Sequence, residues 1–270
     1  MAAIRLYAKV QNPGSGKPPL LLLHGLFGSW ENLGTLARGL AEAFEVHALD
    51  LRNHGRSPHT ESMSYPLMAL DVLAYMAEQG LTQVYLLGHS MGGKTAMQVA
   101  LAEPGKILGV VVLDIAPVTY PPGHVNILEG LRTLPLNEIS SRQEADLHLK
   151  PFVPELPVRS FLLKNLIKVG EQGFAWRMNL RAIDQHYNEI RVGVTSETPY
   201  EGAVLFIKGG QSDYIERLHQ TQITRLFPAA DLRVVPQTGH WLHAEKPDTV
   251  LQVCLRFLLR LTSSRSQNSA

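Results

Sequence analysis

The sequence predicts an α/β protein with a mostly parallel sheet, helices on both faces and an inserted helical cap. Apolar runs of strand length alternate with segments of helical period in 1–116 and again in 200–262. Parallel strands need such crossover helices. Between these parts, 117–199 contains only short helical patterns. We therefore expect a core made of 1–116 and 200–262, a helical cap over 117–199, and a polar, disordered tail over 263–270.

The composition favours a small-molecule partner. The chain has 270 residues, 45% hydrophobic and 18% charged, which suffices for a large core. Its formal charge of +1 gives no field that would attract nucleic acid or an anionic membrane, so we expect neither as a partner. The single cysteine, Cys254, excludes an intramolecular disulfide, and the N-terminus lacks the apolar stretch of a secretory signal. We expect a soluble, cytoplasmic monomer or small homo-oligomer.

Polar residues stand at the ends of the strands expected in the first half of the chain. The expected strands are 4–10, 20–23, 46–49, 84–87 and 107–113, and the expected helices are 33–44, 65–79 and 91–102. His24, Asp50, Ser90 and Asp114 each follow one of these strands. Because ligands of parallel sheets bind beyond the carboxyl ends of the strands, we expect the functional site there.

The second half begins with the inserted segment and then returns to the sheet pattern. Helices are expected near 125–134, from a capping box at 141–144, over 157–169 and over 180–190. They are followed by a strand at 203–207, a helix at 214–227, a strand at 232–235 and a closing helix at 247–261. The inserted segment thus follows a strand end, where it would cover the site.

A G-x-S-x-G motif lies between one of these strands and the helix after it. It reads Gly88-His89-Ser90-Met91-Gly92. A strand, a tight turn and a helix are the context of a nucleophile elbow, in which the serine is held in a strained conformation and its hydroxyl is exposed. We predict that Ser90 is a nucleophile.

A serine nucleophile needs a histidine base that is itself oriented by a carboxylate. Of the eleven histidines, only His240 stands in the expected place, in the loop after the last strand. Two aspartates could orient it. Asp213 follows a strand and precedes His240 by 27 residues, whereas Asp114 ends the strand next to the elbow strand. The residues alone slightly favour Asp213, although it could instead cap a helix, and both stay candidates.

The oxyanion of such a reaction needs two N–H donors, and the amides of Met91 and Leu26 occupy the expected positions. We assign Phe27, His89 and Trp241, which adjoin these groups, as substrate-binding residues. Of the aromatic residues in 117–199, most should pack in the core and one or two should line an acyl pocket; these residues are Phe152, Phe161, Phe174, Trp176 and Tyr187. His240 and His243 form an H-x-x-H pair without a third ligand at suitable spacing, so we expect no metal site.

Five stretches resemble the α/β-hydrolase superfamily, and within it the bacterial YbfF esterases and their eukaryotic relatives of the ABHD11 type. They are Leu23-His24-Gly25-Leu26-Phe27-Gly28-Ser29, Asp50-Leu51-Arg52-Asn53-His54-Gly55, Gly88-His89-Ser90-Met91-Gly92-Gly93-Lys94, Asp114-Ile115-Ala116-Pro117 and Gly239-His240-Trp241-Leu242-His243-Ala244-Glu245-Lys246-Pro247. The resemblance implies an α/β-hydrolase fold and a Ser-His-acid esterase without metal or organic cofactor. It also implies that Asp114 serves the histidine, because the family position matching Asp213 is often not acidic. This chain departs from the family by having both aspartates.

We therefore expect a serine carboxylesterase that hydrolyses small or short-to-medium acyl esters through an acyl-enzyme. Ser90, His240 and Asp114 would form the catalytic triad, with Asp213 as the rival acid. An acyl-CoA thioesterase with the same site is an alternative, and a non-catalytic small-molecule binding protein on the same fold is another.

Overall fold

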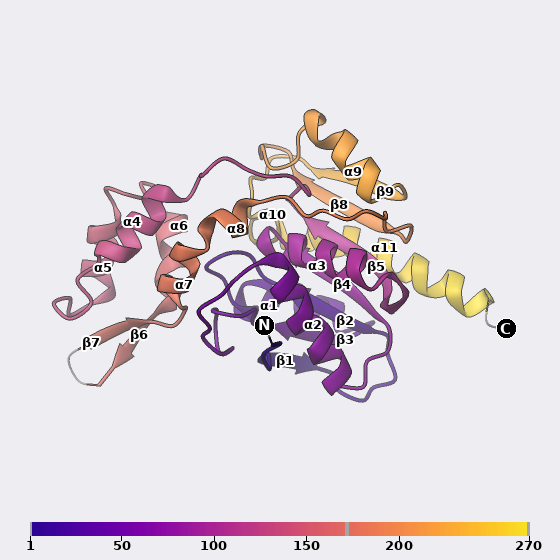
Figure 1. Cartoon of the computed structure of the whole chain (residues 1–270), viewed down its shortest axis with the longest axis horizontal. Coiled ribbons are helices and arrows are strands. Elements are labelled where there is room, and N and C mark those ends of the chain that lie inside the picture. Colours follow the sequence, from indigo (N-terminus) through magenta and orange to yellow (C-terminus); the bar gives the residue numbers. More distant parts are fainter. Residues whose placement is uncertain (1, 171–172, 269–270) are drawn as a thin grey trace.

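The computed structural model describes residues 2–170 and 173–268, and its centre is a seven-stranded sheet in the order β1-β3-β2-β4-β5-β8-β9 (Figure 1). The strands are β1 (Ala8–Gln11), β2 (Pro19–Leu23), β3 (Glu45–Leu49), β4 (Val84–His89), β5 (Ile107–Leu113), β8 (Val204–Gly209) and β9 (Ala230–Val235). Only β1 pairs antiparallel, with β3, and the other pairings in this sheet are parallel. The predicted mostly parallel α/β sheet is confirmed.

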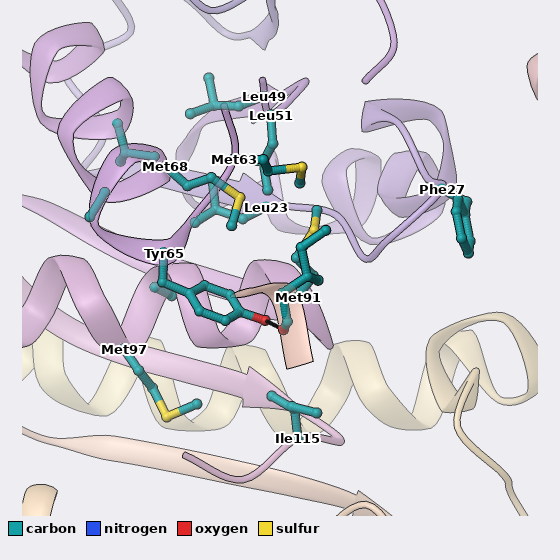
Figure 2. Packing of buried hydrophobic residues seen from close by; sticks show 14 of the residues in the cluster. Leu23, Phe27, Leu49, Leu51, Met63, Tyr65, Met68, Met91, Met97 and Ile115 are labelled. Carbon is teal, nitrogen blue, oxygen red and sulfur yellow. Dashed lines mark hydrogen bonds between the residues drawn. The ribbon is translucent and has the colours of Figure 1, made fainter. Parts of the chain in front are cut away.

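Helices cover both faces of the sheet because its central strands are apolar on both sides. Within β2, Leu21 and Leu23 pack into one hydrophobic cluster, and Leu20 and Leu22 pack into another. The first cluster includes residues of α2 (Tyr65–Glu78), α3 (Met91–Ala102) and α9 (Gln220–Leu226); the second includes residues of α1 (Gly34–Leu40), α10 (Leu242–Glu245) and α11 (Pro247–Asn268). Figure 2 shows part of the first cluster, where Leu23 of the sheet packs with Met68 and Met91 of the helices. This alternation of side chains fixes each strand between two helical layers.

The inserted segment, residues 117–199, lies beside the sheet and is joined to it by two neighbouring chain segments (Figure 1). It contains α4 (Val125–Thr133), α5 (Arg142–Leu149), α6 (Leu156–Leu162), α7 (Leu180–Gln185) and α8 (Tyr187–Arg191), together with a hairpin of β6 (Leu166–Val169) and β7 (Gly173–Trp176). Its apolar side chains belong to the same cluster as those of α2 and α3. The segment therefore packs as part of the protein's core rather than as a separate body.

The expected helix over 157–169 is wrong in its second half. The helix ends at Leu162, a 3₁₀ turn follows, and Leu166–Val169 forms a strand instead. Asn165 breaks the helix because its side chain donates to the carbonyl of Phe27 at 2.7 Å and its own carbonyl accepts from Arg177. The β-branched residues that follow then pair with β7, a contact that helical periodicity does not reveal. The expected helix over 180–190 is likewise divided, at His186.

Three other boundaries differ from the expected ones. The first strand begins at Ala8 rather than near residue 4, and the expected helix over 214–227 starts only at Gln220, after a 3₁₀ turn. The closing helix continues to Asn268, so 263–268 extend it where a disordered tail was expected; 269–270 lie outside the described residues. The hydroxyls of Thr262 and Ser264 each donate to the carbonyl four residues earlier at 3.0 Å.

Candidate active site

Ser90 stands in a sharp turn between β4 and α3 that only glycines on either side allow. Its backbone has φ 53° and ψ −119°, a conformation that costs about 1–3 kcal/mol for a residue with a side chain. A Cβ on Gly88 would lie 2.2 Å from the carbonyl oxygen of Gly92, and a Cβ on Gly92 would lie 2.1 Å from that of Leu23. The turn is therefore a nucleophile elbow in geometry as well as in sequence.

His240 and Asp114 meet at the carboxyl ends of the strands. The His240 Nδ1 atom lies 2.8 Å from Asp114 Oδ2. A carboxylate can only accept, so Nδ1 carries the proton and Nε2 is left as the basic nitrogen. The ring stacks on Tyr214 with 3.9 Å between centroids, and His89 Nε2 donates to the His240 carbonyl at 2.9 Å. The histidine is thus held at its ring and at its backbone.

Asp114 is fully buried, and three donors surround its carboxylate. Oδ1 accepts from the amide of Gly209 at 2.8 Å, while Oδ2 accepts from the Ser212 hydroxyl as well as from His240. Its own backbone has φ 51°, which turns the side chain from the end of β5 towards β8 and β9. These donors fix the carboxylate in the orientation that His240 needs.

Asp213, the rival acid, lies on the surface at the rim of the cavity. Among the described residues its carboxylate has no hydrogen bond or ion pair. Its neighbour Ser212 turns inward to Asp114 instead. Sequence reasoning missed Ser212 and Tyr214; their position directly after the strand β8 was the only signal that could have identified them.

The loop that follows β2 lies against the elbow and carries the Leu26 amide. A Cβ on Gly25 would be 3.4 Å from the Cβ of Ser90, so Gly25 lets this loop approach the serine closely. Phe27 has φ 59°, and its amide donates to His54 Nε2 at 3.1 Å. Its carbonyl accepts from Asn165. Core and inserted segment together therefore hold the loop.

Two buried histidines brace the same loop as neutral rings. His24 Nε2 accepts from the Leu51 amide at 3.0 Å and its Nδ1 donates to Gly25, while His54 Nδ1 donates to Arg52. Burial lowers the pKa of His24 to about 4 and that of His54 to about 3. Each ring can thus donate at one nitrogen and accept at the other, which an imidazolium could not do.

The charged residues Asp50, Arg52 and Arg56 stabilise the loops after β2 and β3. Asp50 accepts from the amides of Trp30 at 2.7 Å and Arg56 at 2.8 Å. Arg52 forms a buried ion pair with Asp71 at 2.6 Å. None of these three residues is in the cavity lining of the described chain, so they support the site through the loops that they hold.

A cavity of about 470 Å³ opens at the elbow between the sheet and the inserted segment. Its lining includes Leu26, Tyr65, Ser90, Met91, Lys94, Ile115, Thr119, Tyr120, Pro121, Gly123, His124, Tyr187, Ile190, Arg191, Asp213, Tyr214, Glu216, Leu218 and His219. The nucleophile and the residues of both expected oxyanion donors share this space. Its size is that of a small-molecule site.

The structure places the three expected substrate-binding residues outside the described cavity lining. Phe27 is buried with its ring 6.1 Å from that of His124, and His89 is buried behind His240 with 4.8 Å between ring centroids. Trp241 packs near Phe161 at 6.2 Å. The His89 side chain bonds to the His240 carbonyl at 2.9 Å. Of the aromatic residues considered in the inserted segment, Tyr187 lines the cavity.

Lys94, one turn after Ser90 on α3, joins the nucleophile helix to both ends of the inserted segment. Its buried ammonium donates to the carbonyls of Val118 at 2.7 Å, Arg191 at 3.1 Å and Val192 at 2.6 Å. The Tyr120 ring faces the same nitrogen at 4.8 Å. Burial lowers the pKa of Lys94 to about 7, while the carbonyls and the ring favour the ammonium form.

Within 2–170 and 173–268, no cluster of three or more His, Cys, Asp or Glu side chains is arranged to hold a metal ion. In the same ranges, every helix is too short or too polar to cross a lipid bilayer.

A nucleophile elbow after β4 and an aspartate–histidine pair at the ends of β5 and β9 define an α/β-hydrolase. The model of the alpha/beta hydrolase family matches residues 20–253, and the chain belongs to this family. It is 39% identical over 249 residues to the sn-1-specific diacylglycerol lipase ABHD11 of Mus musculus. The aligned region covers 89% of this chain and 81% of that protein.

Similarity to bacterial esterases is comparable. The chain is 37% identical over 241 residues to the esterase YbfF of Escherichia coli (strain K12), with 89% of this chain and 92% of that protein covered. Among solved structures, a marine microorganism esterase superposes with a TM-score of 0.91 at 37% identity, covering 94% of this chain and 100% of that one. The family resemblance inferred from the sequence is confirmed.

Proposed function

We propose that this chain is a serine carboxylesterase that hydrolyses small or short-to-medium acyl esters. The observation that carries the proposal is the Asp114–His240 hydrogen bond of 2.8 Å, together with a strained Ser90 that lines a cavity of about 470 Å³. The relatives named above as esterases and a lipase support the same class of reaction.

The reaction proceeds through an acyl-enzyme. His240 Nε2 accepts the Ser90 hydroxyl proton as the serine oxygen attacks the ester carbonyl, and the Leu26 and Met91 amides stabilise the oxyanion that forms. The imidazolium then gives the proton to the leaving alcohol. His240 Nε2 then takes a proton from water as the water oxygen attacks the acyl carbon, and the imidazolium returns this proton to Ser90 Oγ as the carboxylic acid leaves.

Asp114 is the acid of the proposed triad. Its bond to Nδ1 fixes the ring tautomer that leaves Nε2 basic, and it stabilises the imidazolium that forms during the reaction. The exposed position of Asp213 supports this choice over the rival.

The proposed substrate is a small-molecule acyl ester. An acyl-CoA thioester would use the same catalytic groups, so comparing kcat/KM on butyryl-CoA and on an alkyl butyrate tests this alternative. We also propose that the inserted segment acts as a cap over the cavity. A cytoplasmic location and a monomeric or small homo-oligomeric state remain part of the proposal.

Hydrolysis of p-nitrophenyl butyrate by the purified protein and its Ser90→Ala variant tests the function. We expect turnover by the unmodified chain and loss of it in the variant, with unchanged circular dichroism as the control for folding. Equal turnover by both proteins would contradict the proposal, and absence of turnover in the unmodified chain would favour the non-catalytic binding protein.

A further inference from the structure

His124 is a polar side chain of the inserted segment that faces the cavity and that the proposed mechanism does not use. It directly precedes α4 and lines the same space as Ser90 and Leu26. Its ring meets that of Phe27 edge-on at 6.1 Å, next to the Leu26 amide. The side chain is therefore close to the place where an ester would react.

The hydrogen bonds of Tyr187 favour one of the two neutral tautomers of His124. The Tyr187 hydroxyl oxygen accepts from the backbone amide of His124 at 2.9 Å and lies 2.9 Å from its Nδ1. A phenol has one hydrogen to donate, and in the described chain His124 Nδ1 is its one bonded acceptor. With Nδ1 as the acceptor of this hydrogen, the hydroxyl and the ring are both satisfied, and the ring proton is then on Nε2.

His124 Nε2 is separated by Cε1 from the Nδ1 atom that Tyr187 contacts. Among the described residues this nitrogen has no hydrogen-bond partner. It is not fully buried either, because His243 Nδ1 is the one fully buried side-chain nitrogen or oxygen without a partner in the described chain. An N–H donor without a protein partner thus remains available in a side chain that lines the cavity.

The His124 ring stays neutral at neutral pH. Burial lowers the pKa of His124 to about 4, and nearby His240 acts in the same direction. A neutral donor does not oppose the positive charge that His240 gains during catalysis, whereas a lysine or an imidazolium in its place would. The site can therefore offer a hydrogen bond without an added charge.

We propose that His124 Nε2–H donates a hydrogen bond to a second oxygen of the substrate, beside the scissile ester, and that Tyr187 is the positioning residue that sets its tautomer. This inference rests on the proposed esterase function and adds a determinant of specificity to it. The preferred esters carry a hydroxyl, ether or further ester oxygen on the alcohol or on the acyl part. Hydrocarbon esters of the same shape leave Nε2–H unpaired in the filled cavity, which is unfavourable.

Pairs of esters that differ by OH against CH₃ test the proposal. The pair 2-hydroxyethyl butyrate and propyl butyrate places the oxygen on the alcohol part, and the pair propyl 3-hydroxybutanoate and propyl 3-methylbutanoate places it on the acyl part. For at least one pair we expect kcat/KM to favour the hydroxylated ester by about tenfold, the value of one hydrogen bond in a closed site. The pair that shows the preference identifies the side that His124 contacts.

Three variants separate recognition from a general effect on folding. His124→Phe should reduce the ratio of the two kcat/KM values in a pair to about one, because the aromatic ring keeps its packing but loses its N–H donor. His124→Gln, whose amide can place a donor near the Nε2 position, should keep part of the preference. Tyr187→Phe should weaken it, because Nδ1 is no longer held as the acceptor. General damage to the inserted segment would lower kcat/KM equally for both esters of a pair and leave the ratio of the two values unchanged.

The inference is overturned if neither pair shows a preference in the unmodified chain, or if His124→Phe keeps the preference. Failure of the proposed function has a different signature, since the unmodified chain would then hydrolyse none of the four esters.

Discussion

The Asp114 carboxylate and the His240 ring meet at 2.8 Å although 126 positions separate them in the sequence. The two residues come from the ends of β5 and β9, with β8 between these strands. Asp114 spans this distance because its positive φ directs it sideways, where Gly209 at the end of β8 and Ser212 just after it hold its oxygens. The acid and the base are therefore positioned by three neighbouring strands rather than by one loop.

Replacing the two aspartates in turn gives the first prediction. Asp114→Asn should lower kcat by about 10⁴-fold, because an amide at this position no longer fixes the histidine tautomer or balances the imidazolium. Asp213→Asn changes an exposed side chain and should alter kcat/KM by about twofold or less. Steady-state hydrolysis of p-nitrophenyl butyrate measures both. The reverse ranking of the two variants would contradict the assignment.

The elbow makes a prediction about stability. Gly88→Ala should cost more than about 3 kcal/mol of unfolding free energy, since its Cβ would lie 2.2 Å from the backbone oxygen of Gly92 and neither atom can move away easily. Gly105→Ala is the matched control, because a Cβ there meets nothing within 4 Å. Urea denaturation of both variants measures the difference. Similar stabilities would show that the elbow tolerates a side chain at position 88.

Lys94 should connect catalysis to the inserted segment. Lys94→Met removes the donor of three carbonyls but also a buried charge, so we expect a net loss of about 2 kcal/mol in unfolding free energy. KM for an alkyl butyrate should rise more than kcat falls, because the variant changes the cavity wall and leaves Ser90 and His240 in place. Lys9→Met, an exposed lysine on β1, is the control. Unchanged stability and KM would contradict this role.

Buried neutral histidines should make the protein sensitive to acid. Burial lowers the pKa of His54 and His243 to about 3 and of His24 to about 4, from an ordinary value of 6.5. Below pH 6.5 the unfolded chain binds protons that the folded chain does not, so stability is complete above that pH and falls towards pH 4. Each ring contributes about 1.4 kcal/mol per pH unit once its unfolded form is fully protonated.

Unfolding in urea at several pH values between 4.5 and 8, in steps of about half a unit, measures this dependence. His243→Phe should reduce the slope by about 1.4 kcal/mol per pH unit, the contribution of one buried histidine. A stability that stays constant from pH 7 to pH 5 would contradict the account.

Local patterns predicted most of the sheet. Strands such as β5 are short, apolar and bounded by turn residues, and their alternation with helices implies parallel neighbours wherever it occurs. The elbow is also evident from local sequence, because the G-x-S-x-G motif stands between an apolar strand and a helix, although the contact that requires Gly92 is with the distant Leu23.

Contacts between distant segments were harder to predict. The hairpin of β6 and β7 depends on Asn165 binding Phe27, a pairing of an inserted loop with the core that periodicity cannot reveal. For the same reason the sequence left Asp114 and Asp213 as rivals: both follow strands, and only the arrangement of the neighbouring strands decides which one reaches His240. His124 lacked any motif, and its place in the cavity follows from how the inserted segment folds.

The most direct test of the central claim is to identify the residue that becomes acylated or phosphonylated. The unmodified protein and its Ser90→Ala and His240→Ala variants are treated with a fluorophosphonate probe and mapped by peptide mass spectrometry. We predict one adduct, on Ser90, lost in Ser90→Ala and strongly slowed in His240→Ala, because the serine depends on the histidine for activation. An adduct on another residue, or equal labelling of Ser90→Ala, would contradict the account.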